Sequence, residues 1–389
     1  MRAVDAPDHP AGQLPRHRPA ERGLRGRLGP GLRALTAVPG ILTGGGPRGK
    51  LNVPGRQPRA KVPMLRKALV LLLTLLSLTV TPPAVAAPGR AVVLEERLVG
   101  DRMLELLVRS PALGADVGVR LLLPEDYGSN PGKRWPTLYL LHGCCSAAEG
   151  HVEWTTYSDV EDYTEDLDAL IVMPEAGDVG FYSDWLSGPA WETFHLTELR
   201  RLLEHRYRSG HVRTVAGLSM GGFGALSYAG RHPGMFRAAA SYSGVVHTTL
   251  GGEPGARGLM ELIAGFGEDP LKLWGDPVEQ ARIWAAHNPY DLARRLRGTA
   301  VFIASGNGEP GPLDPPGTAA DPLEEVLGAE AVATADRLRE VGVSVTTCLY
   351  GPGTHTWPYW ERELHRSLPM LAKAMGVPFT PPEPLPPAC

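Results

Sequence analysis

Residues 213–226 read Arg-Thr-Val-Ala-Gly-Leu-Ser-Met-Gly-Gly-Phe-Gly-Ala-Leu, and the fold is most readily recognised from this segment. At its centre, Gly217-Leu218-Ser219-Met220-Gly221 matches the Gly-x-Ser-x-Gly pattern of a nucleophile elbow, a sharp turn that presents a serine between a strand and a helix. The turn crowds the backbone, so the positions two before and two after the serine must lack side chains. Gly222 and Gly224 let the following helix pack closely on a sheet. The stretch therefore predicts Ser219 as an activated nucleophile.

The rest of the chain alternates short apolar runs with amphipathic stretches, which is the pattern of strands and helices around a mostly parallel sheet. Besides the strand at 213–216, strands are expected at 91–98, 103–108, 117–122, 138–141, 169–173, 238–242, 300–304 and 343–349. Helices are expected at 191–205, 323–341 and 359–375. No internal repeat or second core interrupts this pattern. We therefore expect one α/β-hydrolase domain over 88–376, with a mostly parallel central sheet, helices on both faces and a Pro-rich tail at 377–389.

Order along the chain limits the partners of Ser219. In this fold an acid and then a histidine follow the nucleophile. His355, after the last expected strand, is the candidate base, and its rival His247 lies too early in the chain. The acid is expected after the strand at 300–304, where order alone permits Asp314, Asp321, Glu324 and Glu325.

A backbone site for a negatively charged oxygen is expected beside the elbow. His142-Gly143-Cys144-Cys145 follows the strand at 138–141, at the place where this fold carries its oxyanion loop. The N–H groups of Cys144 and Met220 are the expected donors to a tetrahedral intermediate. The N-terminus of the helix after Ser219 adds partial positive charge.

The cysteines leave their pairing open. In an oxidising compartment Cys144, Cys145, Cys348 and Cys389 can pair in three ways, and the sequence does not choose among them. No Cys-x-x-Cys or His-x-x-x-His spacing suggests a metal site, so neither a metal nor another cofactor is expected.

Residues 64–86 have the pattern of an export signal. Two basic residues follow Met64, an apolar run of 13 residues spans Ala68–Val80, and Ala-Val-Ala at 84–86 supplies the small residues that a signal peptidase needs. The run is shorter than the roughly 20 residues that cross a bilayer, so no membrane anchor is expected in the mature chain. The pattern predicts a secreted protein, extracellular or in the cell envelope.

The segments before and after the export signal differ in net charge. Residues 1–63 carry 12 lysine or arginine side chains against three acidic ones, whereas residues 87–389 carry 25 basic against 39 acidic ones. The first segment is rich in Pro, Gly and Arg without a hydrophobic period, so we expect it to be a disordered extension or to lie upstream of the true start. The acidic remainder argues against a nucleic-acid partner.

Five short motifs, in order and in similar register, resemble the mycolyltransferase (antigen 85) family of secreted acyltransferases and its wider esterase D-like relatives. The resemblance spans about residues 90–375. The motifs are Phe181-Tyr182-Ser183-Asp184-Trp185, Trp191-Glu192-Thr193-Phe194, Gly217-Leu218-Ser219-Met220, Gly306-Asn307-Gly308 and Gly353-Thr354-His355-Thr356-Trp357-Pro358-Tyr359-Trp360.

The resemblance implies Ser219 as nucleophile, His355 as base and, through the step Leu323-Glu324, Glu324 as the acid that orients the base. It also implies Trp357 as a substrate-site residue, although packing under the last helix explains this side chain equally well.

The resemblance also has a departure that bears on substrate. Family members that act on trehalose have Asp-Gly-Leu-Arg where this chain has His142-Gly143-Cys144-Cys145, so the charged groups that orient the sugar are missing. We expect a secreted serine esterase or acyltransferase that acts on a small-molecule or lipid ester. A trehalose mycolyltransferase or diacylglycerol acyltransferase proper, and a secreted binding protein that does not catalyse, are the alternatives.

Export gives the first testable prediction. The protein secreted by cells that express the full sequence should begin close to Pro88, because cleavage is expected near Ala86–Ala87. N-terminal sequencing of the secreted material measures this directly. A mature protein that still carries residues 1–63 would contradict the prediction.

Overall fold

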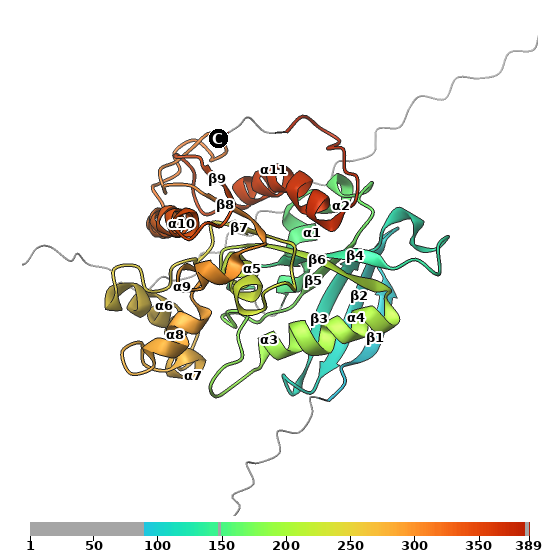
Figure 1. The fold of residues 1–389 in the computed structure, drawn as a ribbon, viewed down its shortest axis with the longest axis horizontal. Helices are drawn as coiled ribbons and strands as arrows, with labels where there is room; N and C mark the ends of the chain where they lie inside the picture. Colours follow the sequence, from blue (N-terminus) through green and yellow to red (C-terminus); the bar gives the residue numbers. More distant parts are fainter. Residues whose placement is uncertain (1–88, 147–148, 386–388) are drawn as a thin grey trace, which may run out of the picture. The chain divides into compact units, whose positions relative to one another are not determined.

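A nine-stranded sheet forms the centre of the protein (Figure 1). The computed structural model describes residues 89–146, 149–385 and 389, so the expectations for 1–63 and for the signal peptide at 64–86 lie outside the described residues. The spatial order of the strands is β1-β2-β3-β5-β4-β6-β7-β8-β9. Along the chain they are β1 (Val92–Leu98), β2 (Met103–Ser110), β3 (Ala115–Leu122), β4 (Trp135–Leu141), β5 (Leu170–Pro174), β6 (Ser209–Leu218), β7 (Ala238–Tyr242), β8 (Ala300–Ser305) and β9 (Val345–Leu349).

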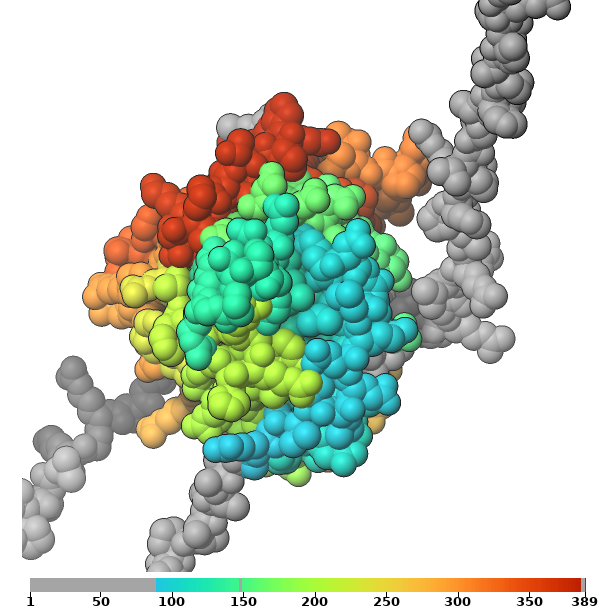
Figure 2. Space-filling view, turned by 90° about the vertical axis from the view of Figure 1, so that its right-hand side faces the viewer, coloured from blue at the N-terminus to red at the C-terminus, as the bar shows by residue number. Residues whose placement is uncertain are grey.

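The sheet is mostly parallel, as the sequence predicts. Strands β5, β4, β6, β7, β8 and β9 pair in parallel, whereas β1, β2 and β3 pair antiparallel at one side, where β3 meets β5. Each expected strand corresponds to one of the nine. The edge strand β1 is mostly exposed, and the blue segments in Figure 2 form part of the surface there.

Alternate residues of the central strands face two separate cores. Val301 and Ile303 of β8 belong to the core that includes α4, α5 and α10, whereas Phe302 and Ala304 belong to the core under α11. Strands buried on both faces read as continuous apolar runs, which is why the sequence revealed them. The predicted helices on both faces of the sheet are therefore present.

The helices agree with the sequence in part. The expected helix at 191–205 is observed as α3 and α4 joined by one π-helical stretch at Phe194–Leu199. The sequence did not predict the four helices between β7 and β8, which are α6–α9. None of the helices in the described ranges is long and apolar enough to cross a membrane. The α-helices of the described residues are α1 (Glu153–Tyr157), α2 (Val160–Tyr163), α3 (Trp191–Thr193), α4 (Arg200–Arg206), α5 (Met220–Arg231), α6 (Glu253–Gly265), α7 (Leu271–Trp274), α8 (Ala281–His287), α9 (Pro289–Leu292), α10 (Pro322–Glu340) and α11 (Trp357–Met375).

The turn between β6 and α5 is strained and crowded. Ser219 has φ 52° and ψ −120°, a conformation that a residue with a side chain rarely adopts. A Cβ on Gly217 would collide with the backbone of Gly221, and a Cβ on Gly221 would collide with the carbonyl oxygens of Leu141 and His142. The glycines of the motif are therefore required by close backbone approach.

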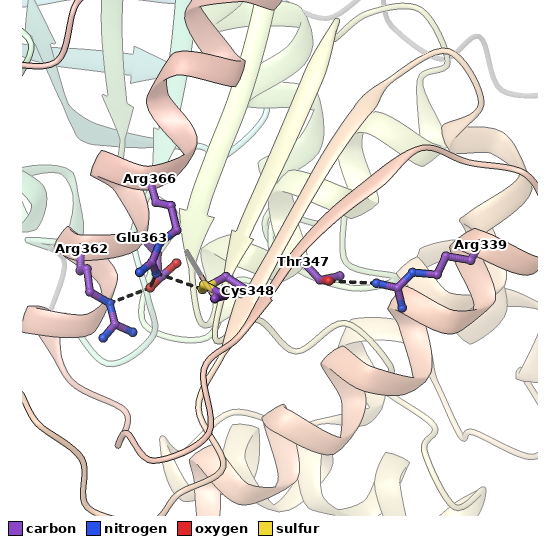
Figure 3. The surroundings of a disulfide bond; sticks show 7 residues. Arg339, Thr347, Cys348, Arg362, Glu363 and Arg366 are labelled. Atoms are coloured by element: carbon purple, nitrogen blue, oxygen red, sulfur yellow. Dashed lines mark hydrogen bonds and ion pairs between the residues drawn. A yellow bond between two sulfur atoms is a disulfide. The ribbon is translucent and has the colours of Figure 1, made fainter. Parts of the chain in front are cut away.

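The cysteines pair as Cys144–Cys145 and Cys348–Cys389. Figure 3 shows the second bond's surroundings, where Arg366 donates to the Cys348 sulfur and Glu363 is paired with Arg362 at 2.8 Å and with Arg366. Cys348, Glu363 and Cys389 are also the one group of three potential metal ligands that lie close together in the described part of the chain. The two sulfurs of this group are bonded to each other. The bond attaches the Pro-rich tail to β9.

Removing this attachment should lower the free energy of unfolding. The bond closes a sequence separation of 41 residues, and cross-links of this kind contribute about 2–4 kcal/mol, mainly by restricting the unfolded chain. We expect Cys389→Ser to lower the denaturant midpoint accordingly. Wild type and variant should unfold at the same midpoint once both are reduced, and an unchanged midpoint in the oxidised proteins would contradict the prediction.

Candidate active site

Ser219 lies at the carboxyl end of β6, directly before α5. Its side chain is 7% exposed, and its Oγ lies 3.0 Å from Nε2 of His355. This distance is that of a hydrogen bond, so the serine hydroxyl and the imidazole meet although they are 136 positions apart in sequence.

Glu324 holds the other side of this imidazole. Its Oε2 lies 2.8 Å from Nδ1 of His355, and its side chain is fully buried. The second oxygen, Oε1, accepts from the hydroxyls of Ser243 at 2.8 Å and Ser305 at 2.9 Å and from the N–H of Gly306 at 2.6 Å. A buried carboxylate is costly unless hydrogen bonds satisfy its charge, and here four donors do so.

These contacts decide how the imidazole of His355 is oriented. A carboxylate only accepts, so Nδ1 carries the proton and Nε2 is free to accept from the hydroxyl of Ser219. The backbone of His355 is fixed as well, because its N–H donates to Asp321 Oδ2 at 3.0 Å. The arrangement can move a proton from the serine to the histidine while the carboxylate stabilises the resulting imidazolium.

The other side chains that chain order permitted lie elsewhere. Asp314 accepts from the hydroxyl of Tyr359 at 2.8 Å, and Glu325 is exposed. The ring of His247 stacks on Tyr290 with 3.9 Å between centroids. Asp321 accepts from backbone N–H groups, those of Leu323 and Glu324 at the start of α10 and that of His355. Glu324 is therefore the one of the four acids whose side chain contacts the imidazole.

Trp357 opens α11 and packs among aromatic rings. Its ring meets Trp154 edge to face at 5.2 Å and Trp360 at 5.3 Å between centroids. Trp360 in turn lies 4.8 Å from the ring of His355. The structure therefore gives Trp357 a packing role under the histidine loop, and its contact with substrate stays a prediction.

The loop after β4 lies against the nucleophile. A Cβ added to Gly143 would lie 3.6 Å from the Cβ of Ser219. Within the described residues the N–H of Cys144 forms no hydrogen bond. The N–H of Met220 occupies the first turn of α5, where such groups have no acceptor within the helix. Both expected oxyanion donors are therefore unpaired beside the serine.

Two side chains that sequence reasoning missed hold this loop. Trp154 Nε1 donates to the carbonyl of Leu141 at 3.0 Å, and the Tyr182 hydroxyl donates to the carbonyl of His142 at 2.9 Å. Tyr182 belongs to one of the five motifs, which was the available signal for it. Ser243, which binds Glu324, was also missed and lies in no motif.

Sheet order, elbow and hydrogen-bonded side chains together define an α/β-hydrolase. The particular family follows from comparison: residues 110–371 match the family model described as "Putative esterase", and the chain belongs to this esterase family. The chain is 31% identical over 287 residues to the diacylglycerol acyltransferase/mycolyltransferase Ag85B of Mycobacterium leprae, covering 70% of this chain and 84% of that protein.

Other relatives agree with the family and the fold. Esterase Rv1288 of Mycobacterium tuberculosis is 34% identical over 210 residues, which is 51% of this chain but only 44% of that longer protein. Among solved structures, Mycobacterium tuberculosis MPT51 (FbpC1) has a TM-score of 0.58 at 23% identity, covering 69% of this chain and 97% of that one. Staphylococcus aureus FphF, a fluorophosphonate-binding serine hydrolase, has a TM-score of 0.54 at 20% identity, covering 74% and 99%.

These findings confirm the predicted family, the predicted fold and an enzyme of the α/β-hydrolase type. The roles of individual side chains stay predictions.

The identity of the acid gives a direct test. Glu324→Gln should lower kcat by about 10²- to 10⁴-fold, because the histidine then loses the group that fixes its tautomer and stabilises its charge. Asp314→Asn is the matched control, and it should change kcat by no more than a few fold. Steady-state kinetics on a p-nitrophenyl ester, with thermal unfolding of each variant, measure both. A larger loss in the Asp314 variant would overturn the assignment.

Proposed function

We propose that the protein is a serine esterase or acyltransferase that acts through a covalent acyl-enzyme. The observation that carries the proposal is the continuous chain of hydrogen bonds from Ser219 Oγ through both ring nitrogens of His355 to Glu324, at 3.0 and 2.8 Å. Membership of the esterase family supports the same chemistry.

In the first step His355 Nε2 takes the hydroxyl proton while Ser219 Oγ forms a bond to the ester carbonyl carbon. The carbonyl oxygen becomes negative and is held by the N–H groups of Cys144 and Met220. The tetrahedral intermediate then collapses, the ester C–O bond breaks, and the leaving alkoxide receives the proton from His355. The acyl group now remains on Ser219.

In the second step water or an alcohol attacks the acyl-enzyme, and His355 again removes the proton. The second tetrahedral intermediate collapses, the bond between the acyl carbon and Ser219 Oγ breaks, and His355 gives its proton to Oγ. Release of the acid or of the new ester leaves Ser219 in its starting state. The same site therefore serves hydrolysis and acyl transfer, and the acceptor decides between them.

The loop after β4 bears on which molecule accepts the acyl group from Ser219. His142 is 1% exposed and faces the interior, and Cys145 carries no charge, so neither supplies the charged contacts that would orient a disaccharide. We therefore favour hydrolysis, or transfer to a simple alcohol, over the trehalose reaction. Of these two reactions, transfer to a simple alcohol is the second candidate, kept because the relative Ag85B is named as an acyltransferase. Short and long p-nitrophenyl esters, with and without glycerol or trehalose, distinguish these cases by the products formed.

Export is part of the proposal. All four cysteines are joined in two disulfides, and such bonds persist in oxidising compartments outside the cytosol. This supports the export signal at 64–86 and a location outside the cell or in its envelope. In this location the protein would act on esters outside the cell or in the cell envelope.

Replacing the nucleophile tests the proposal. Ser219→Ala should lower esterase kcat by roughly 10⁴- to 10⁶-fold and abolish labelling by a fluorophosphonate probe, because the proposed acyl-enzyme forms on the hydroxyl that this change removes. Ser187→Ala, a change at an exposed serine, is the control and should leave both unchanged. A wild-type protein that is neither labelled nor active would support the alternative of a binding protein, and a labelled Ser219→Ala variant would refute the assignment.

A further inference from the structure

His142 is a buried polar side chain that the mechanism above does not use. It directly follows β4, is 1% exposed, and its ring packs so closely on Gly150 that a Cβ there would overlap it. Its Nδ1 lies 2.7 Å from the carbonyl oxygen of Gly143, and its Nε2 lies 2.9 Å from the N–H of Ala176. Both ring nitrogens are therefore engaged with backbone groups of two different loops.

These two partners fix the protonation state of the ring. A carbonyl oxygen only accepts, so Nδ1 carries the proton, and a backbone N–H only donates, so Nε2 is bare. Oε1 of Glu175 lies 3.6 Å from Nε2, beyond hydrogen-bond distance, and it accepts instead from the N–H groups of Gly177 at 2.8 Å and Ala176 at 3.2 Å. Oε2 of Glu175 is paired with Nδ1 of His151 at 3.2 Å. Burial lowers the pKa of His142, which also favours the neutral ring. His142 is thus a neutral donor to Gly143.

The bond to Gly143 has a consequence for the next residue. The carbonyl of Gly143 and the N–H of Cys144 belong to one planar peptide group, and in a trans peptide they point in opposite directions. Fixing the carbonyl toward His142 therefore fixes the direction of the N–H on the other side. Gly143 itself lies against Ser219, with 3.6 Å between its would-be Cβ and the serine Cβ.

We propose that His142 is a positioning residue for the oxyanion hole: its Nδ1–H anchors the Gly143 carbonyl and so keeps the Cys144 N–H directed at the oxygen of the reacting ester. This inference rests on the function proposed above. The neighbouring peptide is held separately, because the N–H of Cys145 donates to the carbonyl of Asp178 at 2.9 Å. The loop thus presents a donor that needs no rearrangement when charge develops.

The size of the effect follows from what is lost. Removing an oxyanion donor altogether costs about 10²- to 10³-fold in kcat in a serine hydrolase. Without His142 the N–H of Cys144 remains but loses its fixed direction, so we expect a loss of about 10- to 100-fold in kcat. KM should change little, because the oxyanion forms only after the substrate has bound.

Two conservative variants separate positioning from packing. The amide nitrogen of an asparagine reaches the place of Nδ1, whereas the amide of a glutamine reaches the place of Nε2. His142→Asn therefore keeps the donor to Gly143 and loses the acceptor for Ala176, and His142→Gln does the reverse. We expect His142→Asn to recover most of the kcat that His142→Gln loses, with the two variants similar in melting temperature.

Gly150→Ala is a second approach, should His142→Gln fold poorly. It leaves the imidazole in the chain but pushes it off its position, and it should lower kcat with little change in KM. Affinity for a trifluoromethyl ketone, which forms a tetrahedral adduct on the serine, should fall in parallel with kcat.

The outcomes are distinct. Equal kcat in the Asn and Gln variants, or losses that follow melting temperature alone, would overturn the positioning role even while fluorophosphonate still labels Ser219. An unlabelled and inactive wild type would instead count against the proposed function. A kcat restored by Asn and not by Gln, with a matching trend in ketone affinity, is the result that the geometry predicts.

Discussion

The buried carboxylate of Glu324 is the constraint on which the site depends. A full negative charge without contact to water is tolerated only if donors surround it, and the donors come from three separate segments. Ser243 follows β7, Ser305 and Gly306 end β8, and His355 lies between β9 and α11. The hydrogen bonds therefore tie the carboxyl ends of three neighbouring strands to α10. The same convergence brings the imidazole of His355 over the end of β6.

A second constraint, backbone crowding, places the nucleophile against its oxyanion loop. Gly221 touches the carbonyl oxygens of Leu141 and His142 so closely that no side chain fits between them. The first turn of α5 and the loop after β4 are thus packed backbone to backbone. This contact positions Ser219 and the unpaired N–H groups side by side without any side chain in the way. Buried side chains behind the loop then fix its carbonyls.

The sequence predicts those parts of the structure that leave a local pattern. Apolar runs located all nine strands, and the glycine-flanked Ser219 located the elbow, because both patterns express burial and crowding directly. Chain order pointed to His355, but four acids satisfied the same order, and Glu324 was preferred only through resemblance. Helices α1, α2 and α6–α9 were not predicted. Ser243 and Tyr182 contact the site through single hydrogen bonds from distant segments, and such contacts have no periodicity that a sequence could display.

The vicinal pairing of Cys144 with Cys145 illustrates the same limit, because three pairings were equally compatible with the sequence and only the fold brings Cys348 to Cys389.

The central claim concerns covalent chemistry at one atom, Ser219 Oγ, and the most direct measurement follows the acyl group. The protein is mixed with a p-nitrophenyl ester, quenched in acid within the first turnover, and digested for peptide mass spectrometry. The account predicts that the peptide containing Ser219 carries the acyl group in an amount that matches the p-nitrophenol released. Release of p-nitrophenol with the acyl group on another residue, or with Ser219 unmodified throughout the first turnover, would contradict it.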